Sequence, residues 1–83
     1  MIIKFLPDPR ERMEERGVTE YEIINTVEEG EEFTAKFGRT GFRRNFEFGG
    51  VWRGKQYQTK QVEVFTVNEN DRFIVITVIV KYF

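Results

Sequence analysis

The chain of 83 residues contains no cysteine and no histidine. Without cysteine it can form no disulfide and offers no thiol nucleophile, and without histidine it lacks the commonest metal ligand and the commonest general base of proteins. These absences exclude zinc and iron sites of the usual kinds and the Ser-His-Asp hydrolases. We therefore expect no metal ion and no cofactor.

Long apolar runs are also missing. The longest, residues 73–80, is interrupted by Thr77 and is far shorter than the ~20 residues that cross a bilayer as a helix. Residues 1–7 have neither the basic leader nor the cleavage site of a signal peptide. We expect a cytoplasmic protein without membrane association, folded as a single domain over residues 1–83. A core this small would gain stability from forming a homodimer.

Two helix starts can be read near the N-terminus. Asp8 is a suitable N-cap, followed by a proline at the first helical position, and this helix is expected to end at Gly17. Thr19 and Glu22 have the spacing of a capping box, which predicts a second helix that ends at Gly30.

The apolar spacing changes from helical to alternating after residue 30, which is typical of strands. The expected strands span residues 2–6, 31–37, 43–48, 56–67 and 73–82. The strand-like piece at residues 43–48 lies inside a glycine-rich irregular region expected between residues 38 and 55, and a turn is expected at residues 68–71. The last strand should be central, with a helix-facing side formed by Ile74, Ile76, Val78, Val80 and Tyr82. We therefore predict an α+β fold, in which two short N-terminal helices pack on one face of a twisted antiparallel β-sheet of three to five strands.

Charge is distributed unevenly along the chain. Residues 36–61 contain seven basic residues, six aromatic residues and a single acidic one, whereas residues 1–35 contain ten acidic and four basic residues. This asymmetry indicates an anionic partner. Cations can neutralise phosphates while aromatic rings stack on unpaired bases, so the pattern favours single-stranded RNA. The predicted RNA-binding residues are Arg39, Arg43, Arg44, Trp52, Arg53, Lys55 and Lys60. Alternatively, the aromatic residues belong to the core and the cations pair with the acidic helices.

RNA cleavage does not require histidine, because the 2′-hydroxyl of the substrate is the nucleophile. The protein need supply only a base, an acid and positive charge beside the phosphate. The candidate catalytic residues are Lys60, Tyr57, Arg43 and Glu63. An alternative for Lys60 and Glu63 is a cross-strand ion pair.

Two other functions are compatible with the same residues. The basic segment could dock an acidic helix of a protein partner, which makes the chain a non-catalytic interaction module. The chain could also be a homodimeric structural domain that associates through its final strand or through an edge strand.

Residues 8–19, followed by Glu22-Ile23-Ile24, resemble the opening of the family named domain of unknown function 4258, and residues 30–31 and 75–83 resemble later parts of it. The resemblance implies helices packed on an antiparallel sheet and a distant similarity to RelE-like interferase toxins and microbial RNases. It therefore implies an RNA-directed role. An antitoxin-like acidic protein is the partner expected under the alternative of an interaction module. The histidine typical of the family falls at Asp8 here, where an aspartate can cap the helix.

Overall fold

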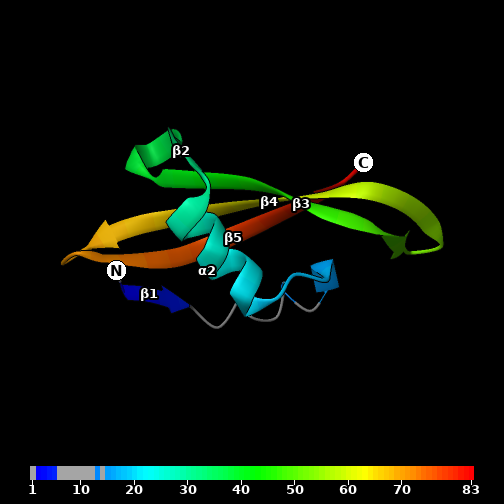
Figure 1. Ribbon diagram of the computed structural model, residues 1–83. Coiled ribbons are helices and arrows are strands. Elements are labelled where there is room, and N and C mark those ends of the chain that lie inside the picture. The colour runs from blue at the N-terminus through cyan, green and yellow to red at the C-terminus, as the bar shows by residue number, and fades with distance from the viewer. Residues whose placement is uncertain (1, 6–12, 14) are drawn as a thin grey trace.

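The computed structural model describes residues 2–5, 13 and 15–83, which form a five-stranded sheet with a helix packed against it (Figure 1). The strands are β1 (Ile2–Phe5), β2 (Glu31–Thr34), β3 (Thr40–Trp52), β4 (Lys55–Glu69) and β5 (Arg72–Tyr82). The helix is α2 (Glu20–Glu29), and a 3₁₀ turn, η1 (Lys36–Gly38), joins β2 to β3. The spatial order of the strands is β1-β5-β4-β3-β2.

The sheet is mixed, because β1 runs parallel to β5 while the other neighbours are antiparallel. The prediction of two N-terminal helices on an antiparallel sheet is therefore wrong, and α2 is the one helix whose bounds the structure describes. The predicted first helix falls largely outside the described residues, although Met13, Glu15 and Arg16 are helical. Strand direction could not be read from so short a segment, since an alternating pattern looks the same in either direction.

The predicted capping box at the start of α2 is confirmed. The amide of Glu22 donates to Thr19 Oγ1 at 3.1 Å, and the amide of Thr19 donates to Glu22 Oε1 at 2.9 Å. The helix ends before Gly30 as expected, but Gly30 is not in the left-handed conformation (φ −79°). A side chain at Gly30 would instead collide with the backbone of Arg43 and Thr26, so the glycine allows α2 to lie close to β3.

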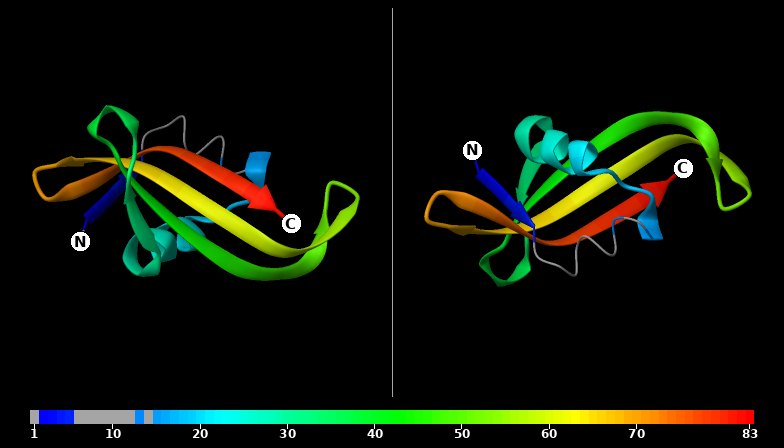
Figure 2. Two further views of the ribbon diagram at one scale, coloured as in Figure 1. Left: turned by 90° about the horizontal axis from the view of Figure 1, so that it is seen from above. Right: turned by 90° about the horizontal axis from the view of Figure 1, so that it is seen from below.

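The glycine-rich segment forms part of a long hairpin rather than the predicted irregular region. Strands β3 and β4 are 13 and 15 residues long, and their hairpin extends well beyond α2 and curls at its end (Figures 1 and 2). The register shifts between Glu47 and Gly50, at a bulge that contains Gly49 (φ 54°), and the hairpin turns at Arg53 and Gly54. These glycines therefore serve the bulge and the turn and do not interrupt the strand.

A second bulge changes which side chains of β5 face the helix. Thr77 lies opposite Phe65 while Val75 lies opposite Thr66, so Ile76 is an extra residue in β5. The alternation therefore switches at Ile76. Val75 is fully buried on the helix side of the sheet. The prediction that Ile74 faces the helix is therefore wrong, because Ile74 lies on the other face of the sheet. The prediction is correct for Val78, Val80 and Tyr82, which follow the bulge.

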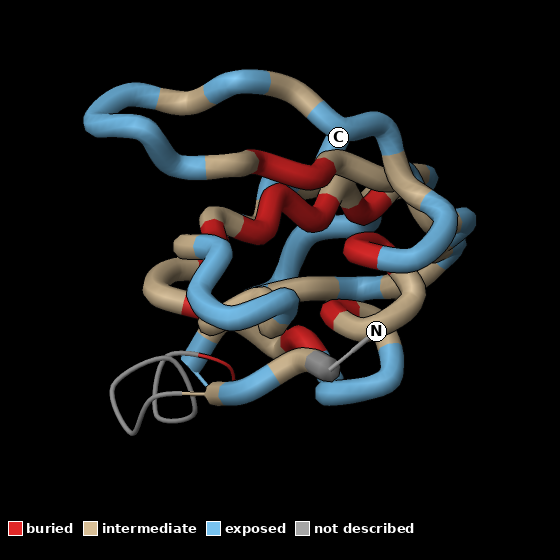
Figure 3. Tube along the Cα trace, turned by 90° about the vertical axis from the view of Figure 1, so that its left-hand side faces the viewer, coloured by how far each residue is buried: buried red, intermediate tan, exposed pale blue. Residues whose placement is uncertain are grey.

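The core lies between α2 and the sheet, and buried segments gather in the middle of the molecule (Figure 3). Its buried apolar residues are Met13, Val18, Ile23, Val27, Phe42, Val62, Val64, Val75 and Val78. Within residues 2–5, 13 and 15–83, no helix is both long and apolar enough to span a membrane.

Candidate nucleic-acid interface

The two faces of the sheet differ in what covers them. On the face toward α2, the register aligns Phe42 with Val64 and Val78, all of which are buried in the core. The other face, here called the open face, carries the alternate positions of the same strands. Its residues are Phe33, Gly41, Arg43, Asn45, Gln61, Glu63, Phe65, Thr77, Ile79 and Lys81.

The open face contains a groove of about 430 Å³ beside the turn that joins β2 to β3. Its lining includes Phe33, Lys36, Phe37, Arg39, Phe65 and Ile79. Phe33 and Phe65 meet edge to face, with centroids 5.8 Å apart. None of the residues that line the groove is acidic. The groove is therefore an apolar and aromatic surface with positive charge at its edge.

Phe37 is the most unusual residue of this groove. Its side chain is 88% exposed, and its backbone is left-handed at φ 62° and ψ 34°. A bulky residue held in this conformation costs about 1–3 kcal/mol, and such strain concentrates at ligand-contacting sites. The prediction that Phe37 belongs to a half-buried strand is wrong, because β2 ends at Thr34 and the chain turns at η1.

Arg43 and Glu63 form an ion pair in the middle of the open face. Arg43 donates from Nε and Nη2 to Glu63 Oε2 at 3.2 and 2.8 Å, and Lys81 Nζ lies 3.3 Å from Glu63 Oε1. Burial raises the pKa of Glu63, but Arg43 and Lys81 outweigh it, so the pKa lies below its ordinary value of 4.5. The cross-strand partners of Glu63 are therefore Arg43 and Lys81, not Lys60.

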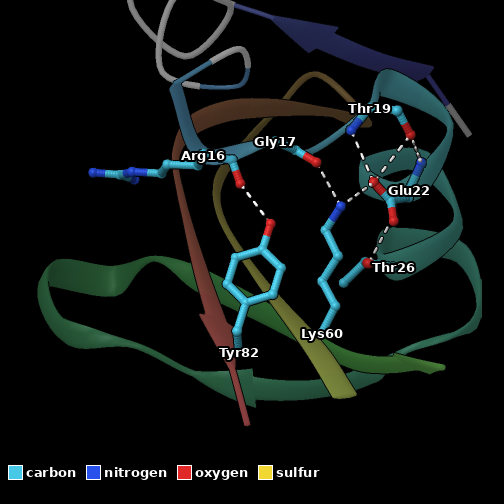
Figure 4. Close-up of polar contacts among 7 residues, drawn as sticks. All are labelled: Arg16, Gly17, Thr19, Glu22, Thr26, Lys60 and Tyr82. Atoms are coloured by element: carbon cyan, nitrogen blue, oxygen red, sulfur yellow. Dashed lines mark hydrogen bonds and ion pairs between the residues drawn. The ribbon is translucent and has the colours of Figure 1, made fainter. Parts of the chain in front are cut away.

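Lys60 lies on the opposite face and is only 6% exposed. Its Nζ donates to the carbonyl oxygen of Gly17 at 2.5 Å and forms an ion pair with Glu22 Oε1 at 2.9 Å (Figure 4). The structure thus brings Arg43 and Glu63 together but separates them from Lys60. The catalytic roles of these residues and of Tyr57 remain predictions.

Two side chains from the sheet and one from the β3–β4 turn bind three successive carbonyl groups of residues 15–17, and we call this arrangement the helix-end cluster. Arg53 Nη2 donates to Glu15 O at 3.0 Å. Tyr82 Oη donates to Arg16 O at 2.9 Å, and Lys60 Nζ donates to Gly17 O (Figure 4). Gly17 is left-handed (φ 70°), and the amide of Val18 donates to Met13 O at 3.0 Å, as at a Schellman helix end. Carbonyls at a helix C-terminus lack intrahelical partners and carry partial negative charge, so two cations and a hydroxyl satisfy them.

Trp52 packs within the same cluster. Its ring stacks on Tyr82 with centroids 5.0 Å apart and an interplanar angle of 16°, and the Arg53 guanidinium lies 5.3 Å from the ring centroid. Tyr57 lies 5.7 Å from Tyr82, with Lys55 Nζ 5.6 Å above the Tyr57 ring. Trp52 therefore already has ring and cation partners within the chain.

The predicted RNA-binding residues are distributed over separate parts of the molecule. Arg39 borders the open-face groove and Arg43 lies on the open face, whereas Arg44 packs beside Phe46, 5.7 Å from its ring, on the side of α2. Arg39 and Arg53 flank the two ends of β3, whose 13 residues have a contour of roughly 40 Å. They cannot belong to one compact site.

Of the residues that line the groove, sequence reasoning predicted only Arg39 as an RNA contact. It missed the others, including Phe33, Lys36, Phe37, Phe65 and Ile79. The available signal was the sequence Lys36-Phe37-Gly38-Arg39, where a large ring precedes a glycine between two cations. Within the described part of the chain, no three acidic side chains are grouped so as to hold a metal ion.

The fold and its two unlike faces define a small mixed-sheet domain with one face covered by a helix and one face open. A family described as Domain of unknown function (DUF4258) matches residues 9–80, which is most of the chain. The chain therefore belongs to this family, as its resemblance to the family predicted. Neither a curated protein nor a solved structure gave a match, and the similarity to RelE-like toxins remains a prediction.

Proposed function

We propose that the open face binds single-stranded RNA. The observation that supports this proposal best is Phe37, whose large ring is held in a strained backbone conformation and is 88% exposed at the edge of the groove. Lys36 and Arg39 flank it in the sequence, and the Arg39 guanidinium lies 5.8 Å from its ring centroid. A ring between two cations can stack on a base while the cations contact the neighbouring phosphates.

The proposal concerns unpaired RNA, because an exposed ring can stack only on a base that is not already stacked in a duplex. Further along the open face, Lys81 adds a cation with an exposed side chain, and Asn45 and Gln61 add amide groups. These amides are hydrogen-bonded to each other at 2.9 Å, which still leaves donor and acceptor positions for base edges. A strand that crosses the open face would therefore meet rings, cations and amides in turn.

Cleavage is not part of this proposal. Glu63 is held by Arg43 and Lys81, and Lys60 is buried on the opposite face. A general base has to reach the hydroxyl from which it removes the proton, and the interactions of Lys60 and Glu63 within the chain do not favour this role.

The test is a fluorescence anisotropy titration of a labelled, unstructured RNA 12-mer at several salt concentrations. Two variants form a matched pair: Lys36→Glu at the groove and Lys55→Glu at the hairpin tip, which are both exposed and have equal effects on net charge. Lys36→Glu is expected to weaken RNA binding. It should also reduce the magnitude of the salt slope, which is the slope of log affinity against log salt concentration, by roughly 0.7 for each phosphate that the protein no longer neutralises. Lys55→Glu is expected to leave the RNA affinity and the salt slope nearly unchanged.

Phe37→Ala tests the stacking contribution separately. It is expected to cost about 1–3 kcal/mol of binding free energy while the salt slope is retained, because stacking releases no counterions. The fold should tolerate the change, since the Phe37 side chain is exposed, and circular dichroism checks this. The proposal fails if the wild type binds no RNA at low salt, or if Lys55→Glu weakens binding as much as Lys36→Glu.

A second candidate is an acidic amphipathic helix of a protein partner. The observation that favours it is the apolar floor of the groove, formed by Phe33, Phe65 and Ile79, since such grooves bind the apolar face of a helix while cations at the edge attract its acidic residues. It becomes the better account if no RNA binds. The same variants then test it against an acidic amphipathic peptide, with Lys55→Glu again as the control.

A further inference from the structure

A second hollow lies beside the helix-end cluster, and Ile79 is the one described residue that lines both it and the open-face groove. Its volume is about 430 Å³, and it is lined by Arg16, Trp52, Arg53, Ile79, Val80 and Tyr82. None of these lining residues is acidic. We call it the arginine cavity, because its polar character comes mainly from two guanidinium groups.

Both guanidinium groups are oriented by backbone carbonyls. Arg16 donates from Nη1 to the carbonyl oxygen of Val78, and Arg53 donates from Nη2 to that of Glu15. A guanidinium has five N–H donors, so each group keeps donors that these bonds do not use. Among the described residues, neither arginine forms an ion pair with a carboxylate. Two positive charges therefore border one cavity that has no acidic residue among its described lining residues.

The rest of the cavity is apolar and aromatic. Trp52 and Tyr82 are stacked at 5.0 Å, and Val80 and Ile79 complete the lining. A cavity of this volume falls within the range of small-molecule sites, which combine apolar walls with a few fixed polar groups. The combination of paired guanidiniums and aromatic walls suits a ligand that is anionic at one end and planar at the other.

We propose that the arginine cavity binds a phosphate monoester carried by a nucleoside, either as a free mononucleotide or as the phosphorylated end of an RNA strand. A monoester offers three terminal oxygens and close to two negative charges near neutral pH, so it can accept hydrogen bonds from both guanidiniums. A bridging phosphodiester offers only two terminal oxygens and one charge. This inference does not rest on RNA binding by the open face, because Lys36, Phe37 and Arg39 do not line this cavity.

The chain itself carries the reporter for the test. Trp52 is its only tryptophan and forms part of the cavity lining. Titration of the wild-type chain with AMP or UMP should therefore change Trp52 emission saturably and raise the thermal unfolding midpoint. Adenosine, which lacks the phosphate, should bind at least about tenfold more weakly. The proposal is overturned if AMP and UMP leave both signals unchanged at 10 mM, or if adenosine binds as well as AMP.

The arginines are tested by Arg16→Gln and Arg53→Gln, with Arg39→Gln at the open-face groove as the charge-matched control. Each of the first two should weaken AMP binding by about tenfold or more, whereas the control should not change it. Arg53→Lys keeps the charge but not the planar fork and should show an intermediate affinity. Equal binding by all variants would place the nucleotide elsewhere and overturn the proposal. If either glutamine variant fails to fold, the comparison of AMP with adenosine on the wild-type chain still tests whether the phosphate is required for binding.

The two sources of the phosphate are separated with dinucleotides. If 5′-phosphorylated ApA binds more tightly than AMP, the ligand of the cavity is the phosphorylated end of an RNA strand. If AMP binds more tightly, the ligand is a free nucleotide. In both cases ApA without the 5′-phosphate, which keeps only its internal phosphodiester, should bind much more weakly than the 5′-phosphorylated form. Phe37→Ala should leave these affinities unchanged, so a failure of this site and a failure of the open face can be distinguished.

Discussion

Trp52 covers the ring of Tyr82 in a nearly parallel stack, with centroids 5.0 Å apart and an interplanar angle of 16°. The stack joins the end of β3 to the end of β5, and it lies next to the hydrogen bond from Tyr82 Oη to Arg16 O. Burial, together with the charge of Glu22, raises the pKa of Tyr82 above its ordinary value of 10, while Arg53 acts in the opposite direction. The environment of this hydroxyl therefore depends on a side chain from the hairpin tip.

Trp52→Ala should lower the pKa of Tyr82 toward 10, because it exposes the phenol to water. An ultraviolet difference titration of tyrosinate measures this shift, and Tyr82→Phe identifies the contribution of Tyr82 among the three tyrosines. Since the folded-state pKa is the higher one, the stability that Tyr82 contributes is present below pH 10 and is lost as the pH rises through the folded-state value. An unchanged titration in a folded Trp52→Ala variant would show that the stack does not desolvate Tyr82.

Gly17→Ala and Gly38→Ala form a matched pair of glycine substitutions. Both glycines are left-handed, with φ of 70° and 69°, but an added Cβ would collide with the Trp52 ring at Gly17 and would meet nothing within 4 Å at Gly38. Gly38→Ala should cost about 1–2 kcal/mol for the backbone conformation alone. Gly17→Ala should cost about 1–3 kcal/mol more. Urea denaturation measures both, and equal destabilisation would mean that Trp52 moves aside freely.

Lys60 and Glu22 should be energetically coupled. Lys60→Met should destabilise the fold by about 3 kcal/mol, because it leaves Glu22 and the carbonyl of Gly17 without their cation. Glu22→Gln should destabilise the fold by less, because the side-chain amide oxygen of glutamine can still accept a hydrogen bond from Lys60 Nζ. In a double-mutant cycle the two effects on the free energy of unfolding should fall short of additivity by about 0.5–3 kcal/mol. Fully additive effects would show that the ion pair contributes nothing by itself.

Glu63 should make stability depend on pH in the acidic range. Its folded-state pKa is lowered, so its contribution is present above its ordinary pKa of 4.5 and is lost as the pH falls from there through the folded-state value. Near pH 7, Glu63→Gln should cost about 1–3 kcal/mol, the range for hydrogen bonds to charged groups. The gap between wild type and variant, measured by denaturation at several pH values, should narrow below pH 4.5. If the difference in stability between wild type and Glu63→Gln stayed constant across this pH range, the predicted contribution of ionised Glu63 would be contradicted.

Local signals predicted the parts of the fold that depend on neighbouring residues. Thr19 and Glu22 lie three residues apart and form their capping box within one turn. Gly17 takes the left-handed conformation expected of a helix end, and the long strand expected at residues 56–67 is present within β4. Features that depend on distant partners were not predictable in this way. The parallel pairing of β1 and the bulge at Ile76 are set by what lies opposite each strand.

The candidate site was harder to predict for a related reason. Residues 36–61 concentrate positive charge along the sequence, but adjacent strand residues point to opposite faces. Arg43 and Arg44 are therefore neighbours in the chain and lie on different sides of the sheet. Arg39 and Arg53 were grouped by charge, although β3 separates them. A cluster of charge in a sequence indicates a common surface only when the register and the bulges of its strands are known.

The helix-end cluster also constrains the order in which the chain folds. The carbonyls of Glu15, Arg16 and Gly17 are bound by side chains 38, 66 and 43 positions away, and contacts of such separation carry a large loop-closure entropy. Residues 15–17 can therefore dock fully only after the β3–β4 hairpin and β5 have paired. In native-state hydrogen exchange, we expect the amide of Val18 to exchange through a local unfolding of lower free energy than the unfolding that exposes the amides of β4. An N-terminal segment that emerges first during synthesis would thus be among the last to reach its final place.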